Sequence, residues 1–253
     1  MIDLTITGDV AEVVLNAPAK LNALSLRELG EMDAAYRSAE ESGVRALVLR
    51  AEGRAFCAGR DIAGVDPVTD DVPGYLGAVE QVMRRIAAFP APTFAAVQGA
   101  CLGVGLGLAI ATDVVYVADD AKIGSPFASL GAMLDSGGHA LLYERLGAHR
   151  ALDLIYTGAM MSGAEAVAAG LFSRAMPVEE VFDFTLQRAA LAAAGPTAAF
   201  VASKRLIARL RGERLWDALA EEARGQEALR STADYREGFA AFQQKRKPDF
   251  TGE

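Results

Sequence analysis

The chain has 253 residues, of which 52% are hydrophobic and 23% charged, as is usual for a globular protein built as one main domain. Its formal net charge of −8 argues against nucleic acids and anionic membranes as partners. Two cysteines, Cys57 and Cys101, are too few for a disulfide framework or a metal cluster. The first residues lack a basic region followed by an apolar core, and no window suits a membrane span, so we expect a cytoplasmic protein.

The amino-terminal part predicts a strand hairpin, a helix and a strand. Residues 2–7 and 11–15 are rich in β-formers on either side of a Gly-Asp pair, which predicts a hairpin. Ser25, with a glutamate three residues later, has the capping-box pattern of a helix over 26–41. Residues 46–50 then predict a short buried strand. This alternation is typical of an α/β fold.

The next part repeats the same kind of unit. A loop over 51–62 that contains glycines follows the buried strand. It lies at the carboxyl end of that strand, where ligand sites of α/β proteins usually lie. Residues 75–89 have helical period, and residues 93–97 predict the next strand. Residues 114–118 and 121–124 predict two further strands. Two successive units of strand and turn suggest a repeated ββα layout.

The segment 95–113 is the centre of this organisation. It predicts a buried strand, a tight turn and a helix, with glycines at Gly99, Gly103, Gly105 and Gly107. Glycines let the backbone approach a ligand closely, and the first N–H groups of a helix have no intrahelical acceptor. The segment therefore predicts an anion or oxyanion site. The alternative is that the glycines serve tight helix packing alone.

The carboxyl-terminal part is mostly helical. Residues 137–146 and 163–170 predict two helices, and residues 173–176 predict a strand. The remaining predicted helices span 196–209, 213–229 and 232–244. A helical appendage after an α/β core often makes partner contacts.

Five motifs, taken together, resemble the enoyl-CoA hydratase/isomerase (crotonase) family. They lie at residues 16–24, 56–62, 99–105, 157–171 and 237–247, in the family's order and over almost the whole chain. The resemblance implies a crotonase-like α/β spiral of ββα units with a carboxyl-terminal helical trimerisation region. On this basis residues 1–195 form the core with an acyl-CoA site and residues 196–253 form the oligomerisation region. It further implies a homotrimer or homohexamer.

The resemblance also implies a set of binding residues. The backbone N–H groups of Ala58 and Val104 match the oxyanion hole that stabilises the thioester carbonyl of an acyl-CoA. Residues that match the coenzyme A contacts are Lys20, Ala58, Asp61 and Ile62, together with Phe242 and Lys245, which usually come from a neighbouring subunit. The alternative for residues 245–247 is a solvated basic tail. Coenzyme A is expected as part of the substrate, with no separate cofactor and no metal.

Two positions depart from the family's hydratases. Those enzymes hold and activate a water with two glutamates, and the matching residues here are Gly107 and Phe127. Neither residue can transfer a proton. The standard addition of water across a double bond is therefore unsupported by this sequence.

Asp135 is the first candidate for proton transfer in its place. An aspartate here resembles that of the family's dienoyl-CoA and phenylacetyl-CoA isomerases, and also the nucleophile of its aryl-CoA dehalogenases. A carboxylate beside an enolisable thioester can remove a proton at one carbon and return it at another. The alternative is that Asp135 caps the helix that follows.

Glu80 is the second candidate, at about the position where the dehalogenases carry a basic histidine; the alternative is a solvated helix glutamate. His139 and His149 lack a nucleophile motif, and Cys57 has no charged neighbour in sequence that would lower its pKa, so structural roles are expected for all three.

We therefore expect an acyl-CoA enzyme that stabilises a thioester enolate and shifts a double bond, with Asp135 as acid and base. One alternative is nucleophilic attack by Asp135, giving dehalogenation or thioester hydrolysis through a covalent ester. Another is a non-catalytic homologue that binds acyl-CoA.

Overall fold

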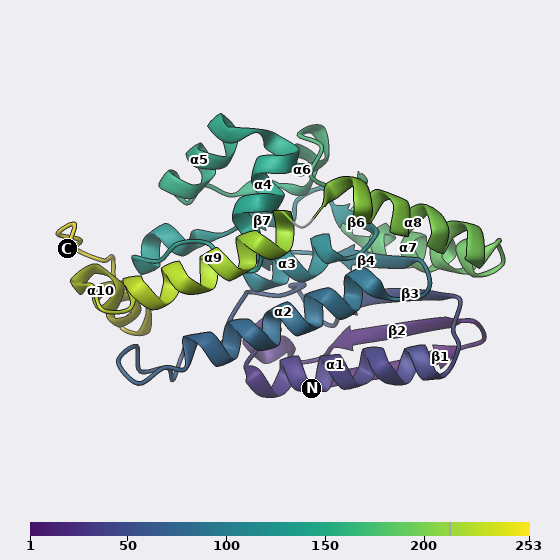
Figure 1. Ribbon diagram of the computed structural model, residues 1–253, viewed down its shortest axis with the longest axis horizontal. Helices are drawn as coiled ribbons and strands as arrows, with labels where there is room; N and C mark the ends of the chain where they lie inside the picture. The colour runs from purple at the N-terminus through teal and green to yellow at the C-terminus, as the bar shows by residue number, and fades with distance from the viewer. Residues whose placement is uncertain (213) are drawn as a thin grey trace.

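A computed structural model describes residues 1–212 and 214–253 (Figure 1). Its larger sheet has six strands in the order β1-β2-β3-β4-β6-β9. The first two strands form the expected antiparallel hairpin, and the other neighbours pair in parallel. The strands are β1 (Ile2–Thr7), β2 (Val10–Leu15), β3 (Ala46–Ala51), β4 (Thr93–Val97), β6 (Val114–Ala118) and β9 (Arg174–Met176).

A smaller sheet joins the successive chain units. It contains β5 (Ala100–Leu102), β7 (Lys122–Gly124) and β8 (Met161–Ser162) in the order β5-β7-β8. A plain turn was expected where β5 lies. That expectation was wrong, because β5 pairs in parallel with β7, a partner about twenty residues later that local sequence does not reveal. A bridge between Cys57 and Cys101 extends this sheet to the loop after β3.

Three helices in the first half of the chain pack in series, the first against the second and the second against the third. Helix α1 (Leu26–Glu41) begins at the expected capping box. Helix α2 (Val72–Ala88) begins three residues before the expected start, because the Asp71 side chain accepts a hydrogen bond from the Gly74 N–H at 2.9 Å and so caps it. Helix α3 (Val104–Ala111) follows β5 and is buried along almost its whole length.

The remaining helices lie mainly in the second half of the chain. Gly147 separates α4 from α5, and the latter was not among the predicted helices. Glu213, at which the sequence predicted the start of a helix, lies outside the described residues. The elements are η1 (Pro18–Lys20), η2 (Pro126–Leu130), α4 (Gly138–Leu146), α5 (Ala148–Thr157), α6 (Gly163–Ala168), α7 (Val178–Ala193), α8 (Thr197–Arg211), α9 (Arg214–Leu229) and α10 (Ala233–Gln243). Among the described helices, none has the length and apolar character needed to cross a bilayer.

The last two helices fold back over the core. Helix α9 runs beside α2, and α10 packs against η2 (Figure 1). The approach of α10 is close, because a Cβ on Gly238 would lie 2.4 Å from the carbonyl oxygen of Leu130. Part of the region 196–253 therefore covers the α/β core within this chain. The division at residue 195 stays a prediction.

Candidate active site

A cavity of about 320 Å³ lies where the loop after β3, the start of α3 and the carboxyl-terminal helices meet. Its wall is mostly apolar, with aromatic side chains from η2 and α10. Among its lining residues are Arg60, Val104, Phe127, Asp135, Tyr235 and Phe239. An apolar cavity with a few convergent polar groups is typical of a small-molecule site.

The backbone hydrogen bonds at this cavity correct the expectation that the Ala58 N–H forms part of an oxyanion hole. The Ala58 N–H donates to the carbonyl oxygen of Leu21 at 2.9 Å, so it is already used and is not free to bind an oxyanion. Just after it, the loop is held by hydrogen bonds from the Leu24 N–H to the Gly59 carbonyl oxygen and from the Asp61 N–H to the Leu24 carbonyl oxygen. The Arg60 N–H between them donates to no acceptor within the described residues. Arg60 therefore offers the free amide of this loop.

The second amide belongs to Val104, the first residue of α3. A residue at this position has no intrahelical acceptor for its N–H, and Val104 lines the same cavity as Arg60. The two loops approach each other closely, since a Cβ on Gly103 would lie 4.0 Å from the Gly59 Cα. Gly103 and Gly59 both have positive φ, +52° and +105°, which favours glycine. Two free amides thus lie on adjoining loops of one cavity.

Asp135 lies between η2 and α4 and is 9% exposed. The Ser136 hydroxyl donates to one of its carboxylate oxygens at 2.7 Å. Burial raises the pKa of Asp135 to about 7, although the Ser136 hydrogen bond and the positive charge of Arg60 act in the opposite direction. The carboxyl group therefore holds or releases a proton near neutral pH.

Asp135 is not a helix cap. Helix α4 begins at Gly138 with Gly137 as its N-cap, and that end of the helix has no capping side chain from Asp135. Besides the main cavity, Asp135 lines a second cavity of about 200 Å³. Asp135 thus belongs to the walls of two cavities.

Of the two residues expected to match the hydratase glutamates, one lines the main cavity with Asp135 and the other contacts the segment that carries it. Phe127 lines the main cavity with its ring. A Cβ on Gly107 would lie 2.6 Å from the Ser136 Cβ, so the segment that carries Asp135 fills the space beside Gly107.

Glu80 lies outside the main cavity. Its side chain projects from α2, is 33% exposed and pairs with Arg84 at 2.7 Å. It lines the second cavity together with Asp135. Glu80 therefore shares the second cavity with Asp135 and is not among the residues that line the main cavity with the two free amides.

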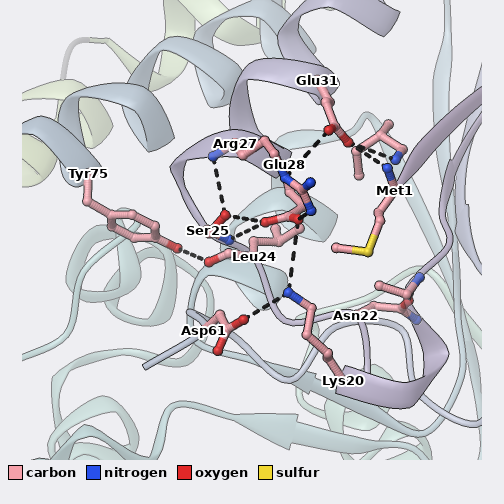
Figure 2. A network of polar contacts seen from close by, with 12 residues as sticks. Met1, Lys20, Asn22, Leu24, Ser25, Arg27, Glu28, Glu31, Asp61 and Tyr75 are labelled. Atoms are coloured by element: carbon pink, nitrogen blue, oxygen red, sulfur yellow. Dashed lines mark hydrogen bonds and ion pairs between the residues drawn. The ribbon is translucent and has the colours of Figure 1, made fainter. Parts of the chain in front are cut away.

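The expected coenzyme A residues fall into two groups. Ala58, Ile62 and Phe242 line the main cavity, and Phe242 does so from α10 of the same chain. Lys20 and Asp61 do not line it but pair with each other at 2.8 Å, and the Lys20 Nζ is 4.0 Å from Glu28 (Figure 2). Lys245 is exposed and is not among the residues that line the cavity.

Several residues of the cavity wall were not predicted from the sequence. Arg60 lies over the Tyr75 ring, 4.1 Å from its centroid, and donates to Asp70 at 2.6 Å. Tyr235 and Phe239 lie one helical turn apart on α10 and are almost fully buried. Their spacing of four residues was the available signal for a shared face.

His139, His149 and Cys57 are the residues for which structural roles were expected. His139 contacts Glu222, and His149 is exposed on α5. Cys57 is fully buried, which raises the pKa of its thiol to about 12. Within residues 1–212 and 214–253, no group of three His, Cys, Asp or Glu side chains is arranged to hold a metal ion.

Comparison with known proteins identifies the family. The family model described as enoyl-CoA hydratase/isomerase matches residues 5–253. A probable enoyl-CoA hydratase of Rhodobacter capsulatus is 36% identical over 252 residues, covering 98% of this chain and 96% of that protein. The 1,2-epoxyphenylacetyl-CoA isomerase of Escherichia coli is 34% identical over 250 residues, covering 96% and 95%.

A solved structure confirms the expected fold. An enoyl-CoA hydratase of Mycobacterium avium subsp. paratuberculosis superposes with a TM-score of 0.89 at 31% identity, over 99% of this chain and 98% of that one. The crotonase-like α/β architecture predicted from the motifs is thus confirmed, together with the class of acyl-CoA enzymes. The chain belongs to the enoyl-CoA hydratase/isomerase family.

Proposed function

We propose that this protein is an acyl-CoA isomerase that shifts a carbon–carbon double bond, with Asp135 as the proton carrier. The observation that carries the proposal is that the buried Asp135 lines the same cavity as the two free amides. Among the described residues that line the main cavity, it is the sole carboxylic acid. With a pKa of about 7, it is suited both to accept and to donate a proton.

The proposed reaction conserves the proton. The Asp135 carboxylate removes a proton from C2 of a 3-enoyl-CoA, and the electron pair delocalises onto the thioester oxygen as a dienolate. The amides of Arg60 and Val104 donate hydrogen bonds to that oxygen, where two fixed donors stabilise the developing charge. Asp135 then returns the proton to C4, which leaves the conjugated 2-enoyl-CoA.

The residues at two positions favour isomerisation over hydration. Gly107 and Phe127 carry no group that can activate a water. The relatives carry both kinds of name, since the E. coli relative is named as an isomerase of an acyl-CoA and several others are named as probable hydratases. The relatives' names do not choose between these reactions, so the proposal depends on the side chains of the cavity.

The testing experiment measures conversion of a 3-enoyl-CoA to its 2-enoyl isomer by ultraviolet absorbance, for the wild type and Asp135→Asn. We expect conversion by the wild type and its loss in the variant. Unchanged conversion in Asp135→Asn would remove Asp135 from the role. Release of halide or free CoA from suitable thioesters would instead indicate attack by Asp135, and binding without any turnover would indicate a non-catalytic homologue.

We further propose that the coenzyme A part of the substrate contacts Lys20, Asp61, Ile62 and Phe242, and that the protein is a homotrimer or homohexamer. Helix α8 supports the second point, because it exposes several large apolar side chains. These are Phe200, Leu206, Ile207 and Leu210. Light scattering of the purified protein tests the assembly, since a monomer mass would contradict it.

A further inference from the structure

Glu222 is a buried carboxylate on α9, 2% exposed, that bonds to the start of α4. One of its oxygens accepts from the Gly137 N–H at 2.7 Å. The other accepts from the His139 N–H at 3.0 Å and lies 2.8 Å from the His139 Nδ1. A buried carboxylate is costly unless it is fully bonded, and a helix amino terminus stabilises negative charge. Glu222 thus caps α4 from a distant helix.

The segment that Glu222 holds is the one that carries Asp135. Asp135 is two residues before Gly137, and the intervening Ser136 has a left-handed φ of +56°, which is unusual for a serine. Helix α9 also binds this segment before Asp135, where the Gln226 side chain donates a hydrogen bond to the Met133 carbonyl oxygen. Helix α9 therefore fixes the chain on both sides of Asp135.

Glu222 also acts on Asp135 through its charge. Its negative charge raises the pKa of Asp135, whereas His139 lowers it. Both carboxyl groups line the second cavity, and Glu80 from α2 faces the same space.

Other elements bring further groups toward Asp135. Arg60 on the loop after β3 lowers the pKa of Asp135, and Tyr75 of α2 and Tyr235 of α10 are close enough for Asp135 to influence their pKa values. Among these groups, Glu222 is the carboxylate that acts on Asp135.

We propose that Glu222 is a positioning residue for Asp135, holding the Asp135 segment against α9 and presenting a second negative charge behind it. The proposal rests on the proposed role of Asp135 as proton carrier. It assigns to α9, within the region 196–253 expected to serve oligomerisation, a part in the acid and base chemistry of the same chain. Its partner in this arrangement is His139, whose Nδ1 lies 2.8 Å from a Glu222 carboxylate oxygen.

The test measures the titration of Asp135 directly. The full-length protein is labelled with ¹³C at the aspartate carboxyl carbons, and the Asp135 signal is identified by its loss in Asp135→Asn. In Glu222→Gln we expect the pKa of Asp135 to fall by about 1, because a nearby like charge is removed. The matched control is Glu221→Gln, which alters an exposed neighbour on α9 that pairs with Arg224, and it should leave the titration unchanged.

A second variant distinguishes the effect of the Glu222 charge from a loosening of the segment that carries Asp135. His139→Gln removes the group that lowers the pKa of Asp135, so the pKa should rise, opposite to the change in Glu222→Gln. Loosening of the segment would admit water and lower the pKa in both variants. Opposite shifts therefore support the proposal, whereas shifts in the same direction or no shift in either would overturn it. If Glu222→Gln fails to fold, a rise in His139→Gln supports the proposal and a fall or no change overturns it.

Kinetics give an independent readout. Glu222→Gln should lower kcat several-fold with little change in KM, and the pH profile of kcat should follow the Asp135 titration. If the wild type shows no isomerisation, the proposed function fails. The carboxyl titration still tests Glu222 in that case, so the two failures are distinguishable.

Discussion

Ser136 fills the space that a side chain at Gly107 would need. A Cβ on Gly107 would lie 2.6 Å from the Ser136 Cβ and 2.8 Å from its carbonyl oxygen. The residue beside the acidic Asp135 therefore takes the volume that a side chain at position 107 would need, which is a position expected to match a hydratase glutamate. In this chain the Asp135 segment and a glutamate at position 107 exclude each other sterically.

Restoring the two glutamates should consequently fail to produce a hydratase. We expect Gly107→Glu combined with Phe127→Glu to show no hydration of a 2-enoyl-CoA, because the Asp135 segment must shift before the new carboxylates fit. Gly107→Ala alone should lower the free energy of unfolding by about 1–3 kcal/mol through overpacking, measured by urea denaturation. The control is Gly30→Ala, where a Cβ in α1 meets nothing within 4 Å and should be neutral or stabilising. Equal effects at both glycines would contradict the steric argument.

The raised pKa of Asp135 predicts a pH dependence of stability. The group binds its proton more tightly in the folded state, with a pKa of about 7, than in the unfolded state, where the value is near 3.8. Between these values the folded state holds more protons at this group, so the contribution of Asp135 to stability is greatest at low pH and falls as pH rises toward 7. Asp135→Asn should remove this loss of stability and raise the free energy of unfolding at pH 8 by about 1–4 kcal/mol. Denaturation of the wild type and Asp135→Asn at pH 5 and pH 8 checks this prediction. If the two proteins differ in free energy of unfolding by the same amount at both pH values, the pKa of Asp135 is not raised.

The Val104 amide can be deleted with little change to the fold. Proline is tolerated at the first position of a helix, which Val104 occupies in α3, yet it has no N–H. Val104→Pro should lower kcat/KM of the isomerisation by about 100-fold to 1000-fold, as for loss of one oxyanion donor. Val104→Ala keeps the amide and removes the side chain, so it should retain most activity. Similar losses in both variants would assign the effect to packing.

The Lys20 and Asp61 pair predicts a contribution to coenzyme A binding. Lys20→Met should raise KM for the acyl-CoA by about 3-fold to 10-fold with little effect on kcat, because the contact that we propose between this positive charge and coenzyme A is lost. The difference from wild type should shrink at high salt, where exposed charges are screened. Lys122, exposed on β7, provides the control in Lys122→Met. A fall in kcat with KM unchanged would place Lys20 elsewhere in the mechanism.

The two thiols should be inert in the folded protein. Burial raises the pKa of Cys57 to about 12 and raises that of Cys101 as well, so neither forms a thiolate at neutral pH. An aromatic disulfide reagent should therefore react slowly with native protein and at once with both thiols in denaturant. Rapid reaction of native protein would show that the loop after β3 opens.

The local elements of this protein were largely predictable from the sequence. The hairpin β1 and β2, helix α1 and strand β4 follow from hydrophobic period, turn residues and the capping box around Ser25, all of which act over a few residues. The motifs also identify the family, and the identities of Gly107 and Phe127 by themselves argue against the two-glutamate chemistry.

The tertiary structure decided which groups of the site are free and which are held. Ala58 and Arg60 are indistinguishable as amide donors in sequence, and hydrogen bonds to Leu21 and Leu24 determine that Arg60 is the free one. Likewise Glu222 and Asp135 are brought together by α9 packing against the start of α4. The sequence by itself determined the elements, the family and the candidate acid, because these depend on local pattern. Only the fold decided the free amide and the carboxylate behind Asp135, because both depend on contacts between residues that are distant in the chain.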